Sequence, residues 1–263
     1  MSRRLVKLFI LMLLLAAPAL RAQSGAPGGA TKSSPDGKSS IPDLSGFWGP
    51  GYRGTLTWDP DDPGGRKPEL APMTPWAMAR FKEAHPPFGI GETFEAINDP
   101  VQRYCDPTGV SRIYFYPWQF MFMQTPDTIY MLYEFGRFWR SIAMNRDHPK
   151  DPDSTWLGDS IGKYEGDTLV IDTVGFNDKT WLDHVGHPHS DSLHLIERFR
   201  RVNHDTLELT VTVDDPKAYT KTFTASKLFK FSTSPMGETL CSMSEMESFQ
   251  KKVIEPSLQA PPK

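Results

Sequence analysis

Hydrophobic and polar residues alternate along much of the second half of the chain, which is the pattern of strands with one buried face. In the clearest case, leucines and valines from Leu207 to Val213 alternate with Glu208, Thr210 and Thr212. A period of two predicts a half-buried strand. Similar runs rich in aromatic and β-branched residues predict further strands over 118–124, 128–135, 137–144, 156–164, 168–174, 193–202 and 220–231.

Three of these strands begin after the same turn, in which Asp-Thr is followed by Ile or Leu. The turn recurs at Asp127, Asp167 and Asp205, at spacings of about 40 residues. The aspartate side chain caps a tight turn and the threonine starts the next strand. We therefore expect a mainly all-β fold, in which an antiparallel meander forms a lipocalin-like barrel or half-barrel.

The first half of the folded region has less regular patterning. Asp43–Trp48 opens it, and the stretch 50–72 is dense in proline and glycine. Thr74 and Pro75 are typical of a helix N-cap and first turn, which predicts one short helix ending near Ala84. The rest of this long N-terminal region is expected to be irregular.

The N-terminus has the pattern of a secretory signal peptide. Three basic residues within the first seven positions precede the apolar run Leu8–Ala17, and the small residue Ala22 follows. The run is shorter than the roughly 20 residues that a membrane span needs. We expect a signal peptide over 1–22 and an exported mature protein, periplasmic or secreted, without a transmembrane span. An uncleaved anchor is the alternative.

The composition of the rest of the chain predicts a leader and one domain. Small and polar residues dominate 23–42, which cannot bury enough apolar surface to offset the entropy of ordering, so a flexible leader is expected. The range 43–263 fits a single β-rich domain. Loss of the signal peptide lowers the formal net charge from −3 to about −7, which argues against nucleic acid as a partner.

Cys105 and Cys241 are the only cysteines of the chain. In an exported protein such a pair favours one disulfide, which would stabilise the fold by constraining the unfolded chain. Two buried free thiols are the alternative.

Several blocks of sequence resemble known families. Gly46–Trp48 resembles the Gly-x-Trp opening of lipocalin-like proteins. The blocks Asp153–Gly162 with Glu165–Leu169, and Val174–Asp183 running on to Glu197–Phe199, resemble an uncharacterised family of exported bacterial proteins. This resemblance implies export and a β-rich fold, and it implies no activity.

Polar chemistry concentrates between Asn177 and Arg198, where four of the seven histidines lie within eleven residues. One hypothesis is a zinc or copper site with His187, His189 and His194 as ligands, because imidazole suits both metals and an open position allows hydrolysis by a bound water. A second interpretation places the histidines on a solvated loop, which we favour for His184 and His204.

Metal-free acid–base catalysis is a further hypothesis. Glu197 falls on an otherwise apolar face, and a carboxyl group that points into a barrel acquires a raised pKa unless it is paired. Asp172, between Val170 and Val174, is a similar polar position. A buried ion pair between Glu197 and an arginine is the structural alternative. The candidate catalytic residues are Glu197, His189, His187 and Asp183.

Aromatic residues crowd the predicted strands between 114 and 139, and both faces of the run 118–123 are apolar. Such a surface is typical of a pocket for a small apolar or aromatic molecule, with membrane contact or an oligomer interface as alternatives. We therefore predict an exported small-molecule-binding protein. The alternative function is an envelope hydrolase or lyase with a Glu/His site, and a structural role comes third. The candidate ligand-binding residues are Trp118, Phe120, Tyr130, Tyr133, Trp181, Asn177 and Arg198.

Overall fold

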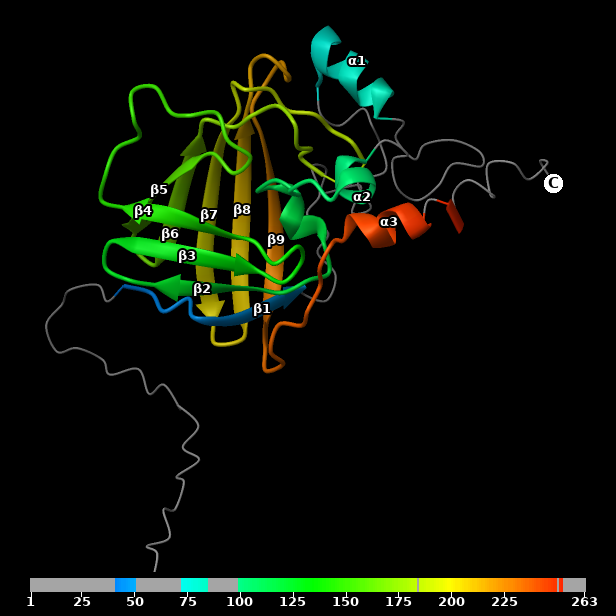
Figure 1. Ribbon diagram of the computed structural model, residues 1–263. Helices are drawn as coiled ribbons and strands as arrows, with labels where there is room; N and C mark the ends of the chain where they lie inside the picture. Colours follow the sequence, from blue (N-terminus) through cyan, green and yellow to red (C-terminus); the bar gives the residue numbers. More distant parts are fainter. Residues whose placement is uncertain (1–40, 51–71, 85–98, 184, 250, 253–263) are drawn as a thin grey trace, which may run out of the picture. The chain divides into compact units, whose positions relative to one another are not determined.

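Nine strands of the described residues close into a barrel in sequence order, with β9 paired to β1 (Figure 1). The computed structural model describes residues 41–50, 72–84, 99–183, 185–249 and 251–252, all within the compact unit Ser39–Lys263. The predicted mainly β, lipocalin-like barrel is confirmed. The strands are β1 (Gly46–Pro50), β2 (Phe120–Gln124), β3 (Thr128–Tyr133), β4 (Trp139–Met144), β5 (Asp159–Glu165), β6 (Thr168–Val174), β7 (His194–Asn203), β8 (Thr206–Asp214) and β9 (Phe223–Ser232).

One strand pair departs from the expected antiparallel meander. β4 and β5 run parallel and pair only at Ala143–Ile161 and Met144–Gly162. The loop between them, residues 145–158, returns the chain to the same end of the barrel before β5 begins. Gly162 permits this close approach, because a Cβ there would lie 2.6 Å from Sδ of Met144. This loop also forms one wall of the cleft described below as the candidate site.

Helices lie outside the barrel wall. The predicted helix is α1 (Pro75–Glu83), and Thr74 caps it by accepting a hydrogen bond from the Ala77 N–H. Three short helices were not expected from the sequence: α2 (Pro100–Tyr104), the 3-10 helix η2 (Arg112–Phe115) and α3 (Met243–Phe249). Helices of four to seven residues are too short to show a 3.6-residue period.

The barrel interior is filled by the chain's own aromatic residues. Tyr114 extends from η2 into the barrel, where its ring lies 5.9 Å from the rings of Phe120 and Phe199 and 6.1 Å from that of Phe229. All four of these side chains are buried. The inward-facing residues Leu207 to Val213 of β8 are also fully buried, as the alternating pattern predicts.

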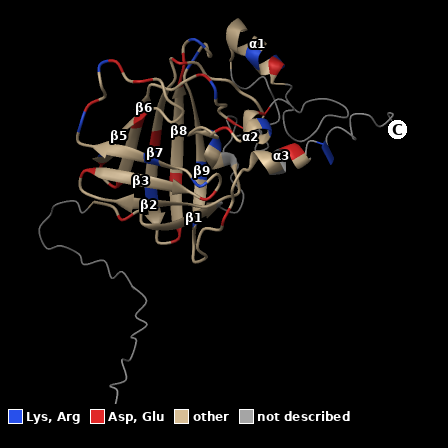
Figure 2. Cartoon of the chain, in the orientation of Figure 1, with Lys and Arg blue, Asp and Glu red and all other residues tan. Residues whose placement is uncertain are grey.

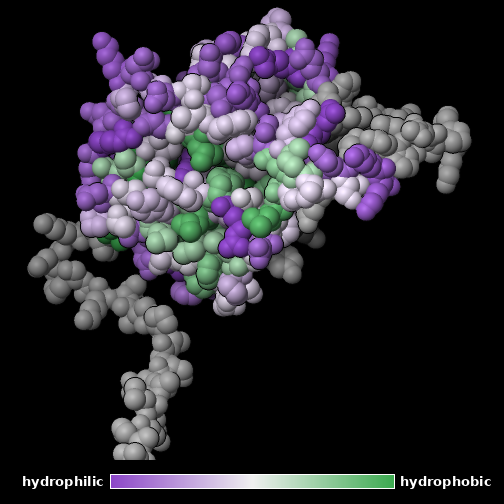
Figure 3. All heavy atoms as spheres, viewed as in Figure 1, coloured by the Kyte–Doolittle hydropathy of each residue, from purple (hydrophilic) through white to green (hydrophobic). Residues whose placement is uncertain are grey.

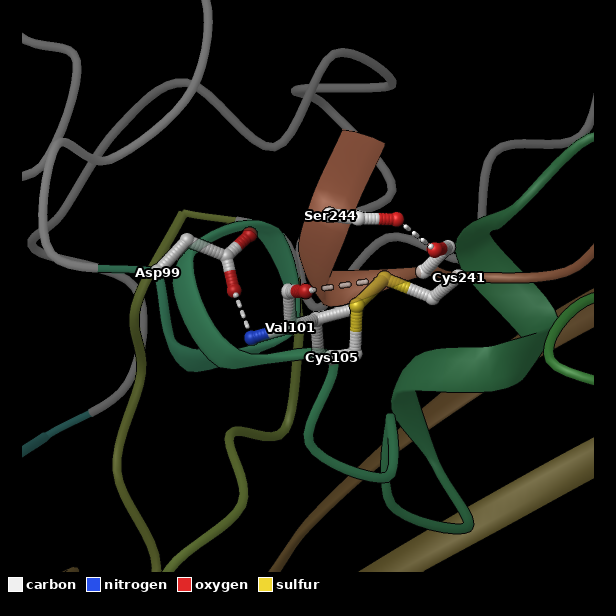
Figure 4. The surroundings of a disulfide bond; sticks show 6 residues. Asp99, Val101, Cys105, Cys241 and Ser244 are labelled. Atoms are coloured by element: carbon white, nitrogen blue, oxygen red, sulfur yellow. Dashed lines mark hydrogen bonds between the residues drawn. A yellow bond between two sulfur atoms is a disulfide. The ribbon is translucent and has the colours of Figure 1, made fainter. Parts of the chain in front are cut away.

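The predicted disulfide is present between Cys105 and Cys241 (Figure 4). Cys105 ends α2 in a left-handed conformation, and Cys241 precedes α3. The bond therefore holds the C-terminal segment against α2, across a sequence separation of 136 residues. Among the helices that the structure describes, none combines the length and apolar character needed to cross a bilayer.

Candidate functional site

Glu197 lies inside the barrel and is fully buried in an ion pair. Oε2 accepts a hydrogen bond from Nη2 of Arg140 at 2.7 Å, and Oε1 accepts one from the Tyr114 hydroxyl at 2.5 Å. Burial alone would lower the pKa of Arg140, but the charge of Glu197 outweighs it and raises that pKa. Burial, together with Glu197, raises the pKa of Tyr114 well above its usual range. Glu197 therefore forms the buried ion pair that was the alternative to acid–base catalysis, and Arg140 is its arginine partner.

Lys227 is a second buried cation in this interior. Its ammonium group donates a hydrogen bond to the Tyr114 carbonyl, and burial lowers the pKa of Lys227 to about 8. Nε and Nη1 of Arg140 have no hydrogen-bond partner. The interior is polar at its centre but occupied by protein side chains.

Asp183 and His187 form a buried pair in the loop before β7. Oδ2 of Asp183 lies 2.5 Å from Nδ1 of His187, and Oδ1 accepts the backbone N–H groups of Val185, Gly186 and His187. The His187 ring stacks on Phe81 of α1, with ring centroids 4.6 Å apart. Nε2 of His187 is buried without a hydrogen-bond partner. The geometry resembles that of a general base whose tautomer is fixed by a carboxylate.

His189 and His194 do not interact with the Asp183–His187 pair, and each has hydrogen-bond partners of its own. The buried His189 ring bonds to Oγ1 of Thr180 at 2.6 Å and to the Ser190 carbonyl at 3.0 Å, and burial lowers its pKa. His194 bonds to Asp172 on the outer face. In the described part of the chain, no three such side chains are arranged to hold a metal ion. The zinc or copper site with His187, His189 and His194 thus stays a prediction.

The candidate ligand-binding residues are spread over different environments. Phe120 and Tyr133 are buried inside the barrel. Tyr130 packs edge-on against Trp139 on the outside, beside other apolar residues of β2 and β3 that Figure 3 shows on this face. Trp118 is 37% exposed and lies near Phe135.

The remaining three candidates are apart from these. The Trp181 ring lies under the guanidinium group of Arg112, 5.3 Å from its centroid, and Arg112 is itself paired with the buried Asp99. The side chain of Asn177 accepts the backbone N–H of Lys179. Arg198 is exposed on β7 and lines a cleft on the outer face of the barrel.

This outer cleft has a volume of about 470 Å³ and lies over β5, β6 and β7. Its floor is apolar, with Ile161, Val170 and Ile196 contributed by the three strands. The strand pairing sets Ile161, Asp172 and Ile196 in one row across the sheet, and Lys163, Val170 and Arg198 in the next row. Its volume falls within the range of about 300–1,000 Å³ that is common for small-molecule sites, while most of its lining residues are polar or charged.

The loop between β4 and β5 forms one wall of the cleft and is tied down by charged groups. Arg146 donates to both oxygens of Asp159, at 2.7 and 2.6 Å. His148 lies between two carboxylates, with Nδ1 3.2 Å from Asp159 and Nε2 3.1 Å from Asp172. Burial opposes ionisation of Asp159, but its hydrogen bonds to Arg146 and His148 lower its pKa.

The far end of the cleft carries a second charged group. Glu165 binds Lys163 at 2.9 Å and Arg198 at 2.7 Å, and these hydrogen bonds lower the pKa of Glu165. Figure 2 shows charged residues of both signs along β7 and its neighbours. The cleft therefore combines an apolar floor with a charged rim. A second hollow, of about 160 Å³, lies beside the disulfide between α2 and Phe138, and is smaller than common ligand sites.

Sequence reasoning missed most of the cleft and misplaced Asp172. The alternation groups Val170, Asp172 and Val174 on one face, but that face is the outside of the barrel. The cleft wall there leaves Val170 only 4% exposed.

The run Gly158–Gly162 has the Gly-x-Ser-x-Gly spacing of a nucleophile elbow. Ser160 lies within a strand, however, and its hydroxyl bonds to Thr173, so that geometry is not formed.

Comparison with known proteins gives no family for this chain. No protein-family model, curated protein or solved structure matches it.

Proposed function

We propose that the protein is an exported small-molecule-binding protein that holds its ligand in the outer cleft over β5–β7. The observation that carries this proposal is the cleft itself, which joins about 470 Å³ of space to an apolar floor and a charged rim. Apolar side chains contribute affinity through burial, while the few charged groups fix the orientation of a ligand.

The ligand we propose has an apolar or aromatic body. Ile161 and Ile196, both half-buried, offer it an aliphatic surface. The barrel interior is less suited, because Tyr114 occupies it and packs against Phe120. Export is supported by the signal-peptide pattern and is compatible with the disulfide, since disulfides persist in oxidising compartments.

Native mass spectrometry of the mature protein, purified after export from its host, tests this function. Wild-type protein should carry an organic adduct. Ile196→Trp fills the cleft and should remove the adduct, because Ile196 is half-buried in the floor. Thr224→Trp is the control, since it places the same ring on an exposed position of β9. An adduct retained by Ile196→Trp, or none on the wild-type protein, contradicts the proposal.

The second candidate function is an envelope hydrolase or lyase. The observation that favours it is the Asp183–His187 pair, in which a carboxylate orients the imidazole and leaves Nε2 without a partner. A base of this kind takes a proton from water or from a substrate carbon, and for His187 this requires that the buried Nε2 become accessible. Glu197 contributes less to this candidate, because both its oxygens already bind Arg140 and Tyr114.

Hydrolysis of a series of p-nitrophenyl esters of increasing chain length tests the second candidate. His187→Gln should lower turnover by about a hundredfold or more, which is the usual contribution of a general base. His204→Gln is the matched control, because His204 is an exposed turn residue. Equal turnover of both variants and the wild type argues against catalysis by His187.

A further inference from the structure

Asp172 is a carboxylate set in the aliphatic centre of the cleft floor. Its cross-strand neighbours are Ile161 on β5 and Ile196 on β7. Val170 and Val174 lie two positions away on the same face of β6. A charged group in apolar surroundings is costly unless it is hydrogen-bonded, so its partners decide what it does there.

The two oxygens of Asp172 have different surroundings. Oδ1 is bonded to both neighbouring imidazoles, at 2.8 Å from Nε2 of His194 and 3.1 Å from Nε2 of His148. Oδ2 has no hydrogen bond within the described part of the chain. Two side chains from different segments thus hold one oxygen, and the other remains an acceptor at a residue that lines the cleft.

The cations around the cleft already have carboxylate partners. Arg146 is bound by Asp159, while Lys163 and Arg198 share Glu165. In the regions described, Asp172 has only histidines as partners. Asp147, which also lines the cleft, forms no ion pair with any residue that the structure describes. The cations keep further N–H donors, but each already faces a carboxylate, whereas Asp172 has no lysine or arginine partner in the regions described and its Oδ2 is an available acceptor.

We propose that the cleft selects small molecules that join a protonated amine to an apolar body, with Asp172 as the residue that determines specificity. This inference rests on the proposed binding function and adds the ligand's chemical class. The ammonium group donates to Oδ2 of Asp172, and the apolar body covers Ile161 and Ile196. Charge-assisted hydrogen bonds are roughly twice as strong as neutral ones, so the amine should bind more tightly than a neutral ligand of the same shape.

Three probes of similar shape and different charge test the proposal: 2-phenylethylammonium, 2-phenylethanol and 3-phenylpropanoate. Each is titrated at pH 7 into the ¹⁵N-labelled full mature protein, and the amide shifts of residues 161, 172 and 196 report binding in the cleft. The ammonium probe should bind at least about tenfold more tightly than the alcohol. The carboxylate probe should bind most weakly of the three.

Asp172→Asn keeps an acceptor oxygen for the histidines but removes the charge. It should abolish the preference for the ammonium probe and leave the affinity for 2-phenylethanol unchanged, which also shows that the variant cleft is folded. Asp147→Asn is the matched control for loss of one cleft charge, and it should keep most of the preference.

The outcomes separate this inference from the function on which it rests. If 2-phenylethanol or 3-phenylpropanoate binds the cleft as well as the ammonium probe, or if Asp172→Asn keeps the preference, the amine specificity is wrong and the binding cleft stands. If none of the three probes shifts the cleft amides, both proposals are overturned.

Discussion

The hydroxyl of Tyr114 donates a 2.5 Å hydrogen bond to Oε1 of Glu197, and this contact ties the 3-10 helix η2 to β7 inside the barrel. Arg140 binds the other carboxylate oxygen at 2.7 Å. An aromatic side chain of the chain itself thus occupies the place where a barrel of this kind would hold a ligand. The interior is thus filled by side chains of the protein, and the space for the proposed ligand lies in the outer cleft over β5–β7.

Removing the charge of Glu197 tests the stabilising role of the interior. Glu197→Gln leaves the Arg140 guanidinium buried without its counterion, and breaking a buried pair in this way costs about 3–5 kcal/mol. The free energy of unfolding is measured by urea denaturation. We expect a loss in that range with an unchanged denaturant slope, as for a purely energetic change.

Glu208→Gln provides the control for this loss. Glu208 forms an ion pair with Arg200 on the outer face, where solvent screens the interaction, so the change should stay within about 1 kcal/mol. A Glu197→Gln variant as stable as Glu208→Gln would show that Arg140 finds other partners, and would reopen a catalytic role for the carboxylate.

Because Lys227 is buried, the free energy of unfolding of the barrel should depend on pH above about 8. Burial lowers the pKa of Lys227 to about 8, from the value of 10.5 that is usual for a lysine in water. Between these values the unfolded chain binds more protons than the folded chain, so stability rises with pH from about 8 to 10. The full difference corresponds to about 3 kcal/mol.

Lys227→Met should remove this rise, because methionine fills a similar volume and does not titrate. Unfolding is followed by urea at pH 7 to 10 for both proteins. The difference between variant and wild type should favour the variant at pH 7 and shrink toward pH 10. A difference that stays constant with pH contradicts the assignment of a lowered pKa to Lys227.

The disulfide should be the main link that holds the C-terminal segment with α3 against α2. Replacing Cys105 and Cys241 together by serine removes a link across 136 residues and so increases the conformational entropy of the unfolded chain. A loss of about 5 kcal/mol is expected on the chain-entropy model for a loop of 136 residues. Amide hydrogen exchange should show the loss of protection first in α2 and α3, because these two helices meet at the bond. Equal protection in oxidised and variant protein argues against this role.

The sequence predicts the fold well because alternation is a local property. The strand over 206–213 buries every second residue, and the barrel follows from a series of strands with this local pattern. The parallel β4–β5 pair is not predictable in this way. It depends on where the loop 145–158 takes the chain, and that loop has no period.

The candidate site is harder to predict, because its residues meet through strand register and not through sequence. Glu197 and Arg140 are 57 positions apart, so the alternation identifies a buried carboxylate but not its partner. For Asp172 the pattern identifies an unusual polar position without telling which face is outside. His148 carries no local signal at all, and it joins the site only because its loop folds back over β5 and β6.

The Asp183–His187 pair predicts a fixed tautomer. Oδ2 of Asp183 accepts from Nδ1, so neutral His187 should carry its proton on Nδ1, with Nε2 as the bare nitrogen. ¹⁵N chemical shifts of the imidazole ring distinguish the two tautomers directly. Asp183→Asn removes the charge from a carboxylate that receives three backbone N–H groups as well, and should cost about 2–3 kcal/mol in unfolding free energy.

Asp178→Asn is the control for that variant, because Asp178 pairs with Arg80 at the surface and should contribute less than about 1 kcal/mol. Both aspartates lie in the same loop region, and each makes an ion pair or hydrogen bond to its partner. They differ in burial, so a large cost at Asp183 alone assigns the effect to the buried histidine pair. A proton found on Nε2 of His187 in the wild-type protein would contradict the assignment, and with it the view of Nε2 as a free base.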